Sequence, residues 1–404
     1  MNYNNTYHQK TAGIIRYSCA LLFMLFTFCY LYFLQGEILA EAQFVYSHGI
    51  TTYNILVGAI IITGVLQIVQ WVMSLITRLP AWAHALTYIP SMLLLAILTA
   101  LDRDSIACFS FGAWVWIAPL VLFGYILLAI LANHITIGHD EDGLFHVKSQ
   151  VYPNYIILFI LILCVGAIPK STDVYHFELK TERLILEGNY ADASSVGQRS
   201  LFTSPRLTQL RMYALSKQGQ LAERIFDYPQ YYGSRGLLDV TDTLPTYRFS
   251  PQRICHYLGA HCHSSIHSAN RFYQLLLADS LWNENTVDYY LCSLLLDKKL
   301  NAFCRELPRY YNLSDTIPHA YDGLPRAYRE ALLTASVPAH AIEGKIVIGS
   351  DTLATLADAE MIASLHDYME RKKELTDPTE RANRTHREFG HTYWWYYDYQ
   401  ELQK

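Results

Sequence analysis

YNILVGAIIITGVLQIVQWVMSLI, residues 53–76, contains no Asp, Glu, Lys or Arg. An uncharged apolar run of about 18 or more residues is long enough to cross the hydrocarbon core of a membrane as a helix. Four further apolar runs give predicted spans at 14–35, 82–100, 112–134 and 152–168. Soluble proteins rarely contain several such helices in succession. We therefore predict a membrane protein with about five spans.

The distribution of charge divides the protein into two chemically different parts. Only five of the 31 Lys and Arg residues precede residue 170 in a sequence of 404 residues. We predict an all-α protein with a transmembrane domain over 1–169 and a soluble helical domain over 170–404. The net charge of −5 gives no support to nucleic-acid binding, because such binding depends on a basic surface.

The loops between the spans predict the orientation, since basic residues favour the cytoplasmic side of a membrane. The N-terminus and the even-numbered loops carry four bases, which are Lys10, Arg16, Arg78 and Lys148. The odd-numbered loops carry only Arg103. We therefore expect a cytoplasmic N-terminus. After five spans, residues 170–404 would then lie outside the cytoplasm, which for a bacterial inner-membrane protein is the periplasm.

A few polar side chains interrupt the predicted spans. Gln67 and Gln70 fall on one helical face, and His84 and Asn133 lie in other spans. They could form a polar path for a transported substrate, or they could make hydrogen bonds between helices. We favour the second interpretation, because amide and small residues commonly hold membrane helices together.

The soluble part contains weakly repeated segments. LEGNYADAS (186–194) and SKQGQLAERIF (216–226) each place a glycine between two apolar helical segments. These segments resemble the tetratricopeptide repeat, a helix–turn–helix unit of about 34 residues. Gly188, Tyr190, Ala193 and Pro205 match its turn, packing and stop positions. The resemblance implies a degenerate stack of helix pairs that binds a partner protein.

CHYLGAHCHSSIH (255–267) concentrates cysteine and histidine residues. If a helix continues through this stretch, Cys255 and Cys262 lie about 10 Å apart along its axis, too far for a disulfide. Only His263 and His267 have the spacing of two metal ligands on one helix, and paired short cysteine spacings are absent. We therefore expect buried thiols here and predict no metal site.

A second cysteine pair is better placed for bonding. Cys292 and Cys304 lie six residues on either side of Lys298, where two adjacent helices are expected to turn. An extracytoplasmic domain can be oxidised. We predict a Cys292–Cys304 disulfide, with two buried free thiols as the alternative.

The C-terminal part combines basic and aromatic residues. We expect helices over 350–375 and 376–390, the second with Arg381, Arg384 and Arg387 at a three-residue spacing. HTYWWYYDY (391–399) follows with six aromatic residues. These aromatics could contact the membrane surface, line a groove for glycan or peptide, or form plain core. The candidate binding residues are Arg381, Arg384, Arg387, Trp394 and Trp395.

The sequence offers no catalytic motif and implies no cofactor. GKIVIGSDT (344–352) lacks the residue order and the strand–loop–helix frame of a phosphate-binding loop. We also find no Ser-His-Asp frame, zinc-protease motif or paired-carboxylate motif. No catalytic residue is therefore predicted.

The architecture and the ending FGHTYWWYYDY (389–399) resemble an uncharacterised family of Bacteroidota inner-membrane proteins with a C-terminal tetratricopeptide-like domain. The resemblance implies no established activity. We expect a membrane-anchored scaffold in contact with membrane lipid and an unidentified protein partner. The alternative is an envelope enzyme that acts on lipid-linked or glycan substrates at the membrane surface.

Overall fold

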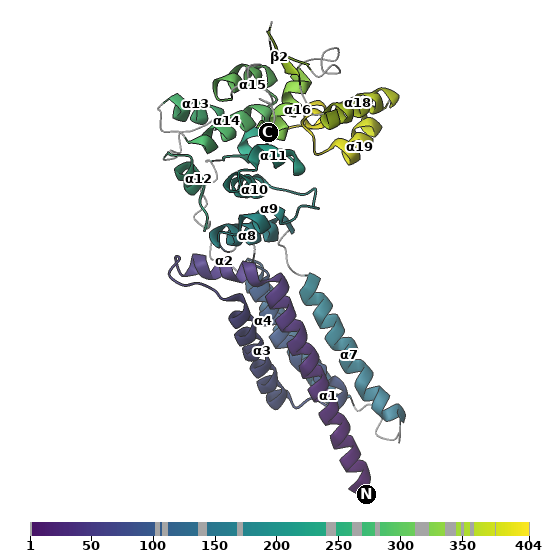
Figure 1. Ribbon diagram of the computed structural model, residues 1–404. Coiled ribbons are helices and arrows are strands. Elements are labelled where there is room, and N and C mark those ends of the chain that lie inside the picture. Colours follow the sequence, from purple (N-terminus) through teal and green to yellow (C-terminus); the bar gives the residue numbers. More distant parts are fainter. Residues whose placement is uncertain are drawn as a thin grey trace. The chain divides into compact units, whose positions relative to one another are not determined.

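The computed structural model describes residues 2–101, 106, 112–135, 144–167, 173–239, 248–260, 269–278, 283–311, 323–335, 345–348, 351–355, 359–375 and 377–403. The protein forms two compact units (Figure 1). The membrane unit comprises Met1–His176 with Leu244–Arg248. The helical unit comprises Phe177–Thr243 with Phe249–Lys404. Each unit is described by itself below.

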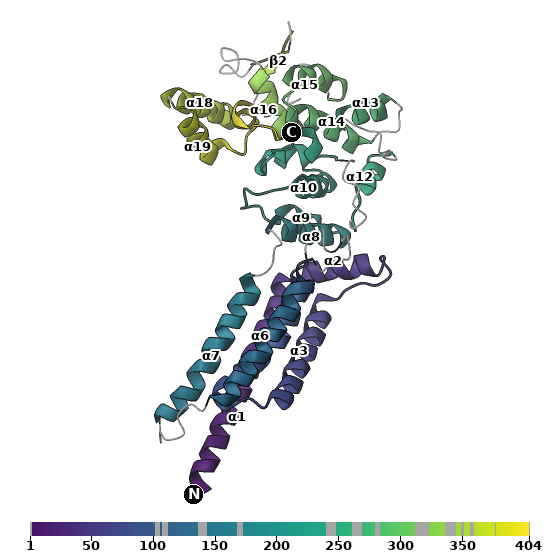
Figure 2. The ribbon, with the colours of Figure 1, turned by 180° about the vertical axis from the view of Figure 1, so that it is seen from behind.

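The membrane unit consists of long helices that run alongside one another (Figure 2). Five helical stretches are long and apolar enough to cross a membrane: Gly13–Leu34, Ile55–Thr77, Ala81–Thr99, Trp114–His134 and Gln150–Ala167. The predicted spans are confirmed to within two residues at each end. The elements are α1 (Asn2–Cys29), a π-helical turn (Tyr30–Leu34), α2 (Gly36–Tyr46), α3 (Ile55–Thr77), the 3-10 helix η2 (Ala81–Tyr88), α4 (Ile89–Thr99), α6 (Trp114–His134) and α7 (Leu144–Ala167).

The outer helices of this unit expose large apolar side chains. Ile61 and Trp71 on α3, and Trp116 and Leu120 on α6, are each more than half exposed. The span formed by η2 and α4 is instead largely buried within the unit. Apolar surface of this extent is unfavourable in water, so the exposed faces fit a hydrocarbon environment.

Polar side chains of the membrane unit bond to neighbouring helices. The Gln67 amide donates to Oε1 of Gln70 at 2.9 Å, and the Gln70 amide donates to Oγ1 of Thr87 at 2.8 Å. Asn154 on α7 accepts from the Ala85 backbone N–H at 2.6 Å and donates to the Ala81 carbonyl at 2.8 Å. Asn154 thereby pairs backbone groups of η2 that lipid could not hydrogen-bond. The expected interhelical hydrogen bonding is confirmed for Gln70, which bonds to Thr87 on η2, whereas the bond from Gln67 to Gln70 lies within α3.

The helical unit confirms the predicted helical fold. Its helices are α8 (Asp173–Leu186), which begins before the unit boundary, α9 (Tyr190–Ser195), α10 (Pro205–Lys217), α11 (Leu221–Arg224), α12 (Pro251–Tyr257), α13 (Ala269–Ala278), α14 (Glu284–Leu296), α15 (Leu300–Glu306), α16 (Arg326–Ala335), α18 (Ala359–Glu374), α19 (Pro378–Phe389) and α20 (Tyr393–Tyr399). Short 3-10 turns cover Ile225–Asp227, Gly233–Gly236 and Leu307–Arg309. Apolar side chains from helices throughout this unit form one continuous core.

One small antiparallel hairpin departs from the helical pattern. Strand β1 (Lys345–Ile348) pairs with β2 (Asp351–Thr355), with Val347 opposite Thr352. The predicted helix over 350–375 is therefore wrong at its start, because α18 begins only at Ala359. The β-branched run Ile346–Ile348 favours a strand and supplies the pairing partner for the following segment.

Four helices of this unit end with the same backbone turn. After α8, α10, α12 and α14 comes a residue with a positive φ angle: Gly188, Gly219, Gly259 and Lys298. In each case its N–H bonds to the carbonyl three residues earlier, and the next N–H bonds to the carbonyl five residues before it. This pair of hydrogen bonds defines the Schellman motif, a helix ending that usually contains glycine and reverses the direction of the backbone. A recurring turn thus separates consecutive short helices.

A buried ion pair joins α8 to α10, and both of its residues bond to the backbone just before α12. Glu182 on α8 and Arg206 on α10 pair at 3.0 Å, and both side chains are almost fully buried. Glu182 also accepts from the Phe249 backbone N–H at 2.7 Å, and Arg206 donates to the Phe249 carbonyl. Because the charges satisfy backbone groups as well as each other, these bonds offset the cost of their desolvation.

Cys292 and Cys304 are free and buried. The predicted Cys292–Cys304 disulfide is therefore wrong, and the pair matches the alternative of two buried free thiols. The Cys292 sulfur instead lies 3.7 Å from the Tyr328 hydroxyl on α16. Both cysteines lie six residues from Lys298, but this symmetric spacing does not determine the direction in which each thiol points.

Cys255 is disulfide-bonded, contrary to the expected buried thiol. The helix that we expected to continue through this stretch is absent after Tyr257, because α12 ends there and the backbone turns at Gly259. Cys262, His263 and His267 lie outside the described residues.

Candidate functional site

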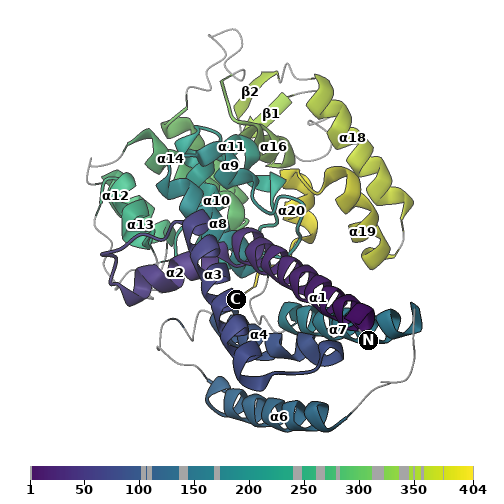
Figure 3. The same ribbon diagram turned by 90° about the horizontal axis from the view of Figure 1, so that it is seen from below.

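The aromatic C-terminal segment folds as helix α20, which lies between α16 and the α18–α19 pair (Figure 3). The buried Glu330 on α16 accepts from the Tyr393 backbone N–H at 2.7 Å. It also accepts from Nε of Arg326 at 2.7 Å. A carboxylate at the start of a helix accepts a hydrogen bond from a backbone N–H that has no partner within the helix. Its negative charge also interacts favourably with the positive end of the helix dipole. Glu330 and the N-cap residue Thr392, whose hydroxyl accepts from the Trp395 N–H, therefore both bind the start of α20.

Lys298, the one non-glycine residue among the four helix-ending turns, fixes the other end of α20. Its ammonium group donates to the carbonyls of Tyr397 at 2.9 Å and Gln400 at 2.7 Å. In return, the Tyr396 hydroxyl donates to the Leu296 carbonyl, at the end of α14, at 2.6 Å. Each helix thus caps the free carbonyls of the other.

Burial assigns most of the aromatic ending to the core of the helical unit. Tyr393, Trp394 and Tyr396 are at most 2% exposed and belong to the core of the helical unit. Trp395 is half-buried, and its indole Nε1 donates to the Ala382 carbonyl at 3.3 Å. Most of the segment is therefore core, and neither tryptophan is a free surface group.

A pocket of about 500 Å³ opens beside α20. We call it the α18–α20 pocket. Its lining residues are Leu333, Thr334, Leu365, Tyr368, Met369, Lys372, Lys373, Arg381, Trp394, Tyr397 and Asp398. Apolar and aromatic side chains form most of its wall, and charged groups converge on it. This combination is typical of a ligand or peptide site.

The charges that line the α18–α20 pocket do not cancel. Its lining contains the cationic residues Lys372, Lys373 and Arg381 but only one carboxylate, Asp398. Asp398 pairs with Lys372 at 2.6 Å and accepts from the Tyr368 hydroxyl at 2.5 Å. Burial, followed by the bond to Asp398, raises the pKa of Tyr368, so this phenol keeps its proton. The lining therefore has an excess of positive charge.

The predicted basic strip is only partly used. Arg381 lines the pocket, as does the buried Trp394. Arg384 pairs with Glu380 at 2.7 Å, and Arg387 is exposed; neither lines the pocket, nor does Trp395. A three-residue step turns a helix by about 300°, so Arg387 lies about 120° around α19 from Arg381.

Most residues of the α18–α20 pocket carry no signal in the sequence. Lys372 and Lys373 stand in ERKKEL at the end of α18, a common location for basic residues that interact with a helix dipole. Asp398 appeared as one acid within an aromatic run. Neither carried a distinguishing local signal, because their association depends on how α16, α18 and α20 pack.

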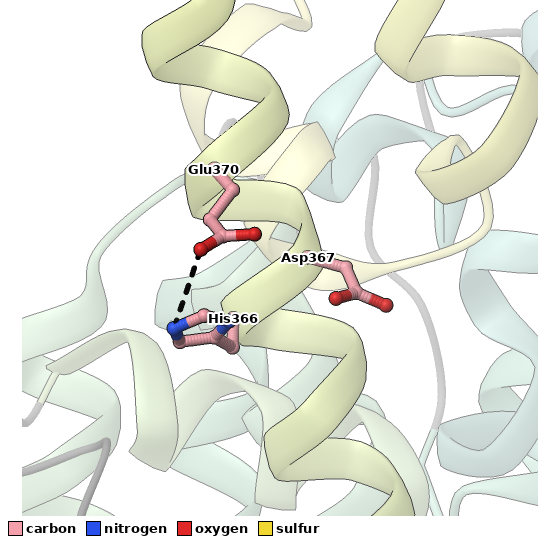
Figure 4. Close-up of side chains that lie close together, drawn as sticks. All are labelled: His366, Asp367 and Glu370. Atoms are coloured by element: carbon pink, nitrogen blue, oxygen red, sulfur yellow. Dashed lines mark ion pairs between the residues drawn. The ribbon is translucent and has the colours of Figure 1, made fainter.

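An exposed group on α18 has metal-ligand residue types. His366, Asp367 and Glu370 offer donor atoms that all lie within 4.8 Å of one another. Nε2 of His366 lies 3.8 Å from Oε1 of Glu370 one turn further on, whereas Asp367 projects from another side of the helix (Figure 4). Such a cluster is also typical of an ordinary solvated helix face, and we assign it no function.

A buried polar cluster lies between α14 and α16. Oδ1 of Asp288 accepts from the hydroxyls of Tyr311 and Tyr328, each at 2.9 Å. Burial raises the pKa of Asp288, and burial raises the pKa of Cys292 still more strongly. A thiol that keeps its proton is a poor nucleophile. The cluster is therefore suited to holding helices together rather than to covalent catalysis.

Comparison with known proteins bears on this part of the molecule. Residues 251–400 match a family of unknown function, DUF6057. The matched segment begins with α12, ends just after α20 and contains every residue that lines the α18–α20 pocket. The five membrane-spanning stretches lie outside it. No curated protein and no solved structure shows significant similarity to this protein.

Proposed function

We propose that this protein is a membrane-anchored scaffold of the cell envelope, whose helical unit binds a partner protein at the α18–α20 pocket. The single observation that carries the proposal is this pocket, with an apolar wall and excess positive charge. Its walls are fixed by Glu330 and Lys298, which bind the two ends of α20. A preformed site of this kind costs little ordering free energy when a partner binds.

The helical unit is, in this proposal, a degenerate tetratricopeptide-like array. Support comes from the repeated turns after α8, α10, α12 and α14, which divide the unit into short helices. The segments between them vary in length, so the repeats are unequal. Stacked helix pairs provide extended surfaces for partner binding.

The proposed compartment is the bacterial inner membrane with the helical unit in the periplasm. The loop distribution of lysine and arginine supports this orientation. The disulfide at Cys255 gives independent support, because disulfides persist in oxidising compartments and are rare in the cytosol. The exposed apolar faces of α3 and α6 supply the contact with membrane lipid.

Site-specific photocrosslinking tests the proposal. A photoreactive amino acid at Thr334, in the pocket, is expected to crosslink a discrete envelope protein in intact cells. The same amino acid at the exposed Arg271 on α13 serves as the control and should not trap that protein. Equal crosslinking at both positions, or none at Thr334, would contradict partner binding at the pocket.

The alternative, an envelope enzyme acting on lipid-linked or glycan substrates, would use the same pocket.

A further inference from the structure

We propose that the α18–α20 pocket recognises a peptide segment of the partner that places a carboxylate next to a large apolar side chain. This inference rests on the proposed function and adds the chemistry of the bound segment. The carboxylate is either the terminal carboxylate of the partner or an Asp or Glu side chain, since both present the same group.

The apolar wall selects the side chain of the segment. Leu333 on α16, Leu365 and Met369 on α18, and Trp394 on α20 converge on the pocket from three helices. The flexible methionine side chain can adjust its shape to a bulky aliphatic or aromatic group, and the aromatic ring offers that group a large apolar contact area. A pocket of about 500 Å³ has room for such a side chain together with its own backbone.

The cations select the carboxylate. Three cationic residues, Lys372, Lys373 and Arg381, line the pocket, against one lining carboxylate, Asp398, which pairs with Lys372 at 2.6 Å. The lining as a whole therefore has excess positive charge. Arg381 uses Nε for the Leu375 carbonyl at 2.8 Å, so its position is fixed by the connection between α18 and α19. Lys373 is exposed at the rim and can reach an incoming carboxylate. Charge-assisted bonds to a carboxylate are stronger than neutral hydrogen bonds.

Two further groups favour a peptide over a lipid phosphate. Asp398 is a hydrogen-bond acceptor at the pocket, and a peptide N–H can donate to it, whereas an ionised phosphate diester has no donor and would be repelled. The buried indole Nε1 of Trp394 has no hydrogen-bond partner among the described residues. A carbonyl or carboxylate oxygen of a bound peptide is the kind of acceptor that this donor lacks.

Three fluorescein-labelled peptides test the inference against the full-length protein in lipid nanodiscs. The first ends in Gly-Ser-Gly-Leu-Phe with a free carboxylate, the second is its C-terminal amide, and the third is the amide of Gly-Ser-Glu-Leu-Phe. Fluorescence anisotropy gives each dissociation constant. We expect the first or the third to bind at least about fivefold more tightly than the second, and which one does so identifies the source of the carboxylate.

The variants assign that preference to the pocket. Lys373→Gln should remove most of the preference for the charged peptide, because it removes a cation from the pocket lining. Lys373 is exposed, so this change should not disturb the core. Arg384→Gln is the matched control; Arg384 lies on α19 outside the pocket, so the preference should persist. Equal affinity for all three peptides, or a preference that survives Lys373→Gln, overturns the inference.

The two proposals fail separately. If Thr334 crosslinks a discrete partner while the three peptides bind equally, the carboxylate inference fails and the scaffold function stands. If the charged peptides bind selectively but Thr334 crosslinks nothing in cells, the pocket chemistry stands and the scaffold function fails.

Discussion

Lys298 shows how one residue can serve two opposed requirements. Its φ of 56° lies in the left-handed region, where the three equivalent turns have glycine. The ammonium group offsets this unfavourable backbone conformation through its bonds to the carbonyls of Tyr397 and Gln400. The backbone requirement and the contribution of the ammonium group can be separated by substitution.

We predict that Lys298→Ala destabilises the helical unit by about 1 kcal/mol more than Lys298→Gly does, because only glycine adopts this φ without steric cost. Both variants should be less stable than the parent, since both lose the ammonium group. Pulse proteolysis of the full-length protein across a urea series measures these differences. Lys299→Ala, at the neighbouring residue with an ordinary φ, is the control; equal stability of the two Lys298 variants would refute the strain argument.

Asp288 makes stability depend on pH. Burial raises its pKa in the folded state, so its contribution is fully present below the ordinary aspartate pKa and is lost as the pH rises through the raised value. Asp288→Asn can keep both tyrosine hydrogen bonds, because both are accepted by Oδ1. We expect the variant to lose less stability than the parent as the pH rises.

Thermal unfolding of the detergent-solubilised protein between about pH 4 and pH 8 measures this effect. Asp367→Asn, at an exposed position, is the matched control and should follow the parent. Glu330 also has a raised pKa from burial, so the slope should decrease without vanishing. Parallel curves for Asp288→Asn and the parent would contradict the assignment.

At the scale of elements, α20 is a short helix that depends on its neighbours. It has seven residues, Tyr393–Tyr399, fewer than an isolated helix needs for stability in water. Glu330 at its start and Lys298 at its end supply the missing stabilisation. The pocket wall that α20 contributes therefore exists only in the folded unit.

Glu330→Ala is expected to loosen α20, because the buried Tyr393 N–H loses its acceptor at a cost of about 1–3 kcal/mol. Hydrogen exchange of the Tyr393–Tyr399 amides should accelerate about tenfold or more. Glu380→Ala removes an exposed carboxylate from the α19 ion pair and should leave this exchange unchanged. Unaltered exchange in Glu330→Ala would show that packing alone holds α20.

Asn154 has the corresponding role in the membrane unit. It is fully buried and pairs backbone groups of η2. We predict that Asn154→Ala lowers stability by about 1–3 kcal/mol, because lipid offers no replacement bonds. Thermal unfolding in detergent measures it. Asn133→Ala, which loses one 3.3 Å bond from an exposed amide, should have a smaller effect; equal effects would count against this role.

At the scale of the whole molecule, cysteine chemistry bears on the compartment. Cys255 is disulfide-bonded, whereas Cys292 and Cys304 are free. We expect alkylation of the unfolded, unreduced protein to label Cys292 and Cys304 but to spare Cys255. Peptide mapping by mass spectrometry reads the result, with a reduced sample as the control. Labelling of Cys255 before reduction would remove the support that this bond gives to a periplasmic helical unit.

The sequence by itself determined the five membrane spans and the helical character of the rest of the protein. Both properties are local, because an uncharged apolar run or a glycine between helical segments acts through its immediate neighbours. The expected turn at Gly188 follows from the same kind of signal. The basic strip at Arg381, Arg384 and Arg387 was visible, but helical rotation left only Arg381 at the pocket.

Only the tertiary structure decided the remaining features. It placed Cys292 against Tyr328 rather than Cys304, ended α12 at Tyr257, and buried most of the aromatic ending. It also brought Lys373 and Asp398 to one pocket from different helices. These outcomes depend on which helix faces meet, and facing is determined by the packing of the whole core, which no local stretch of residues encodes.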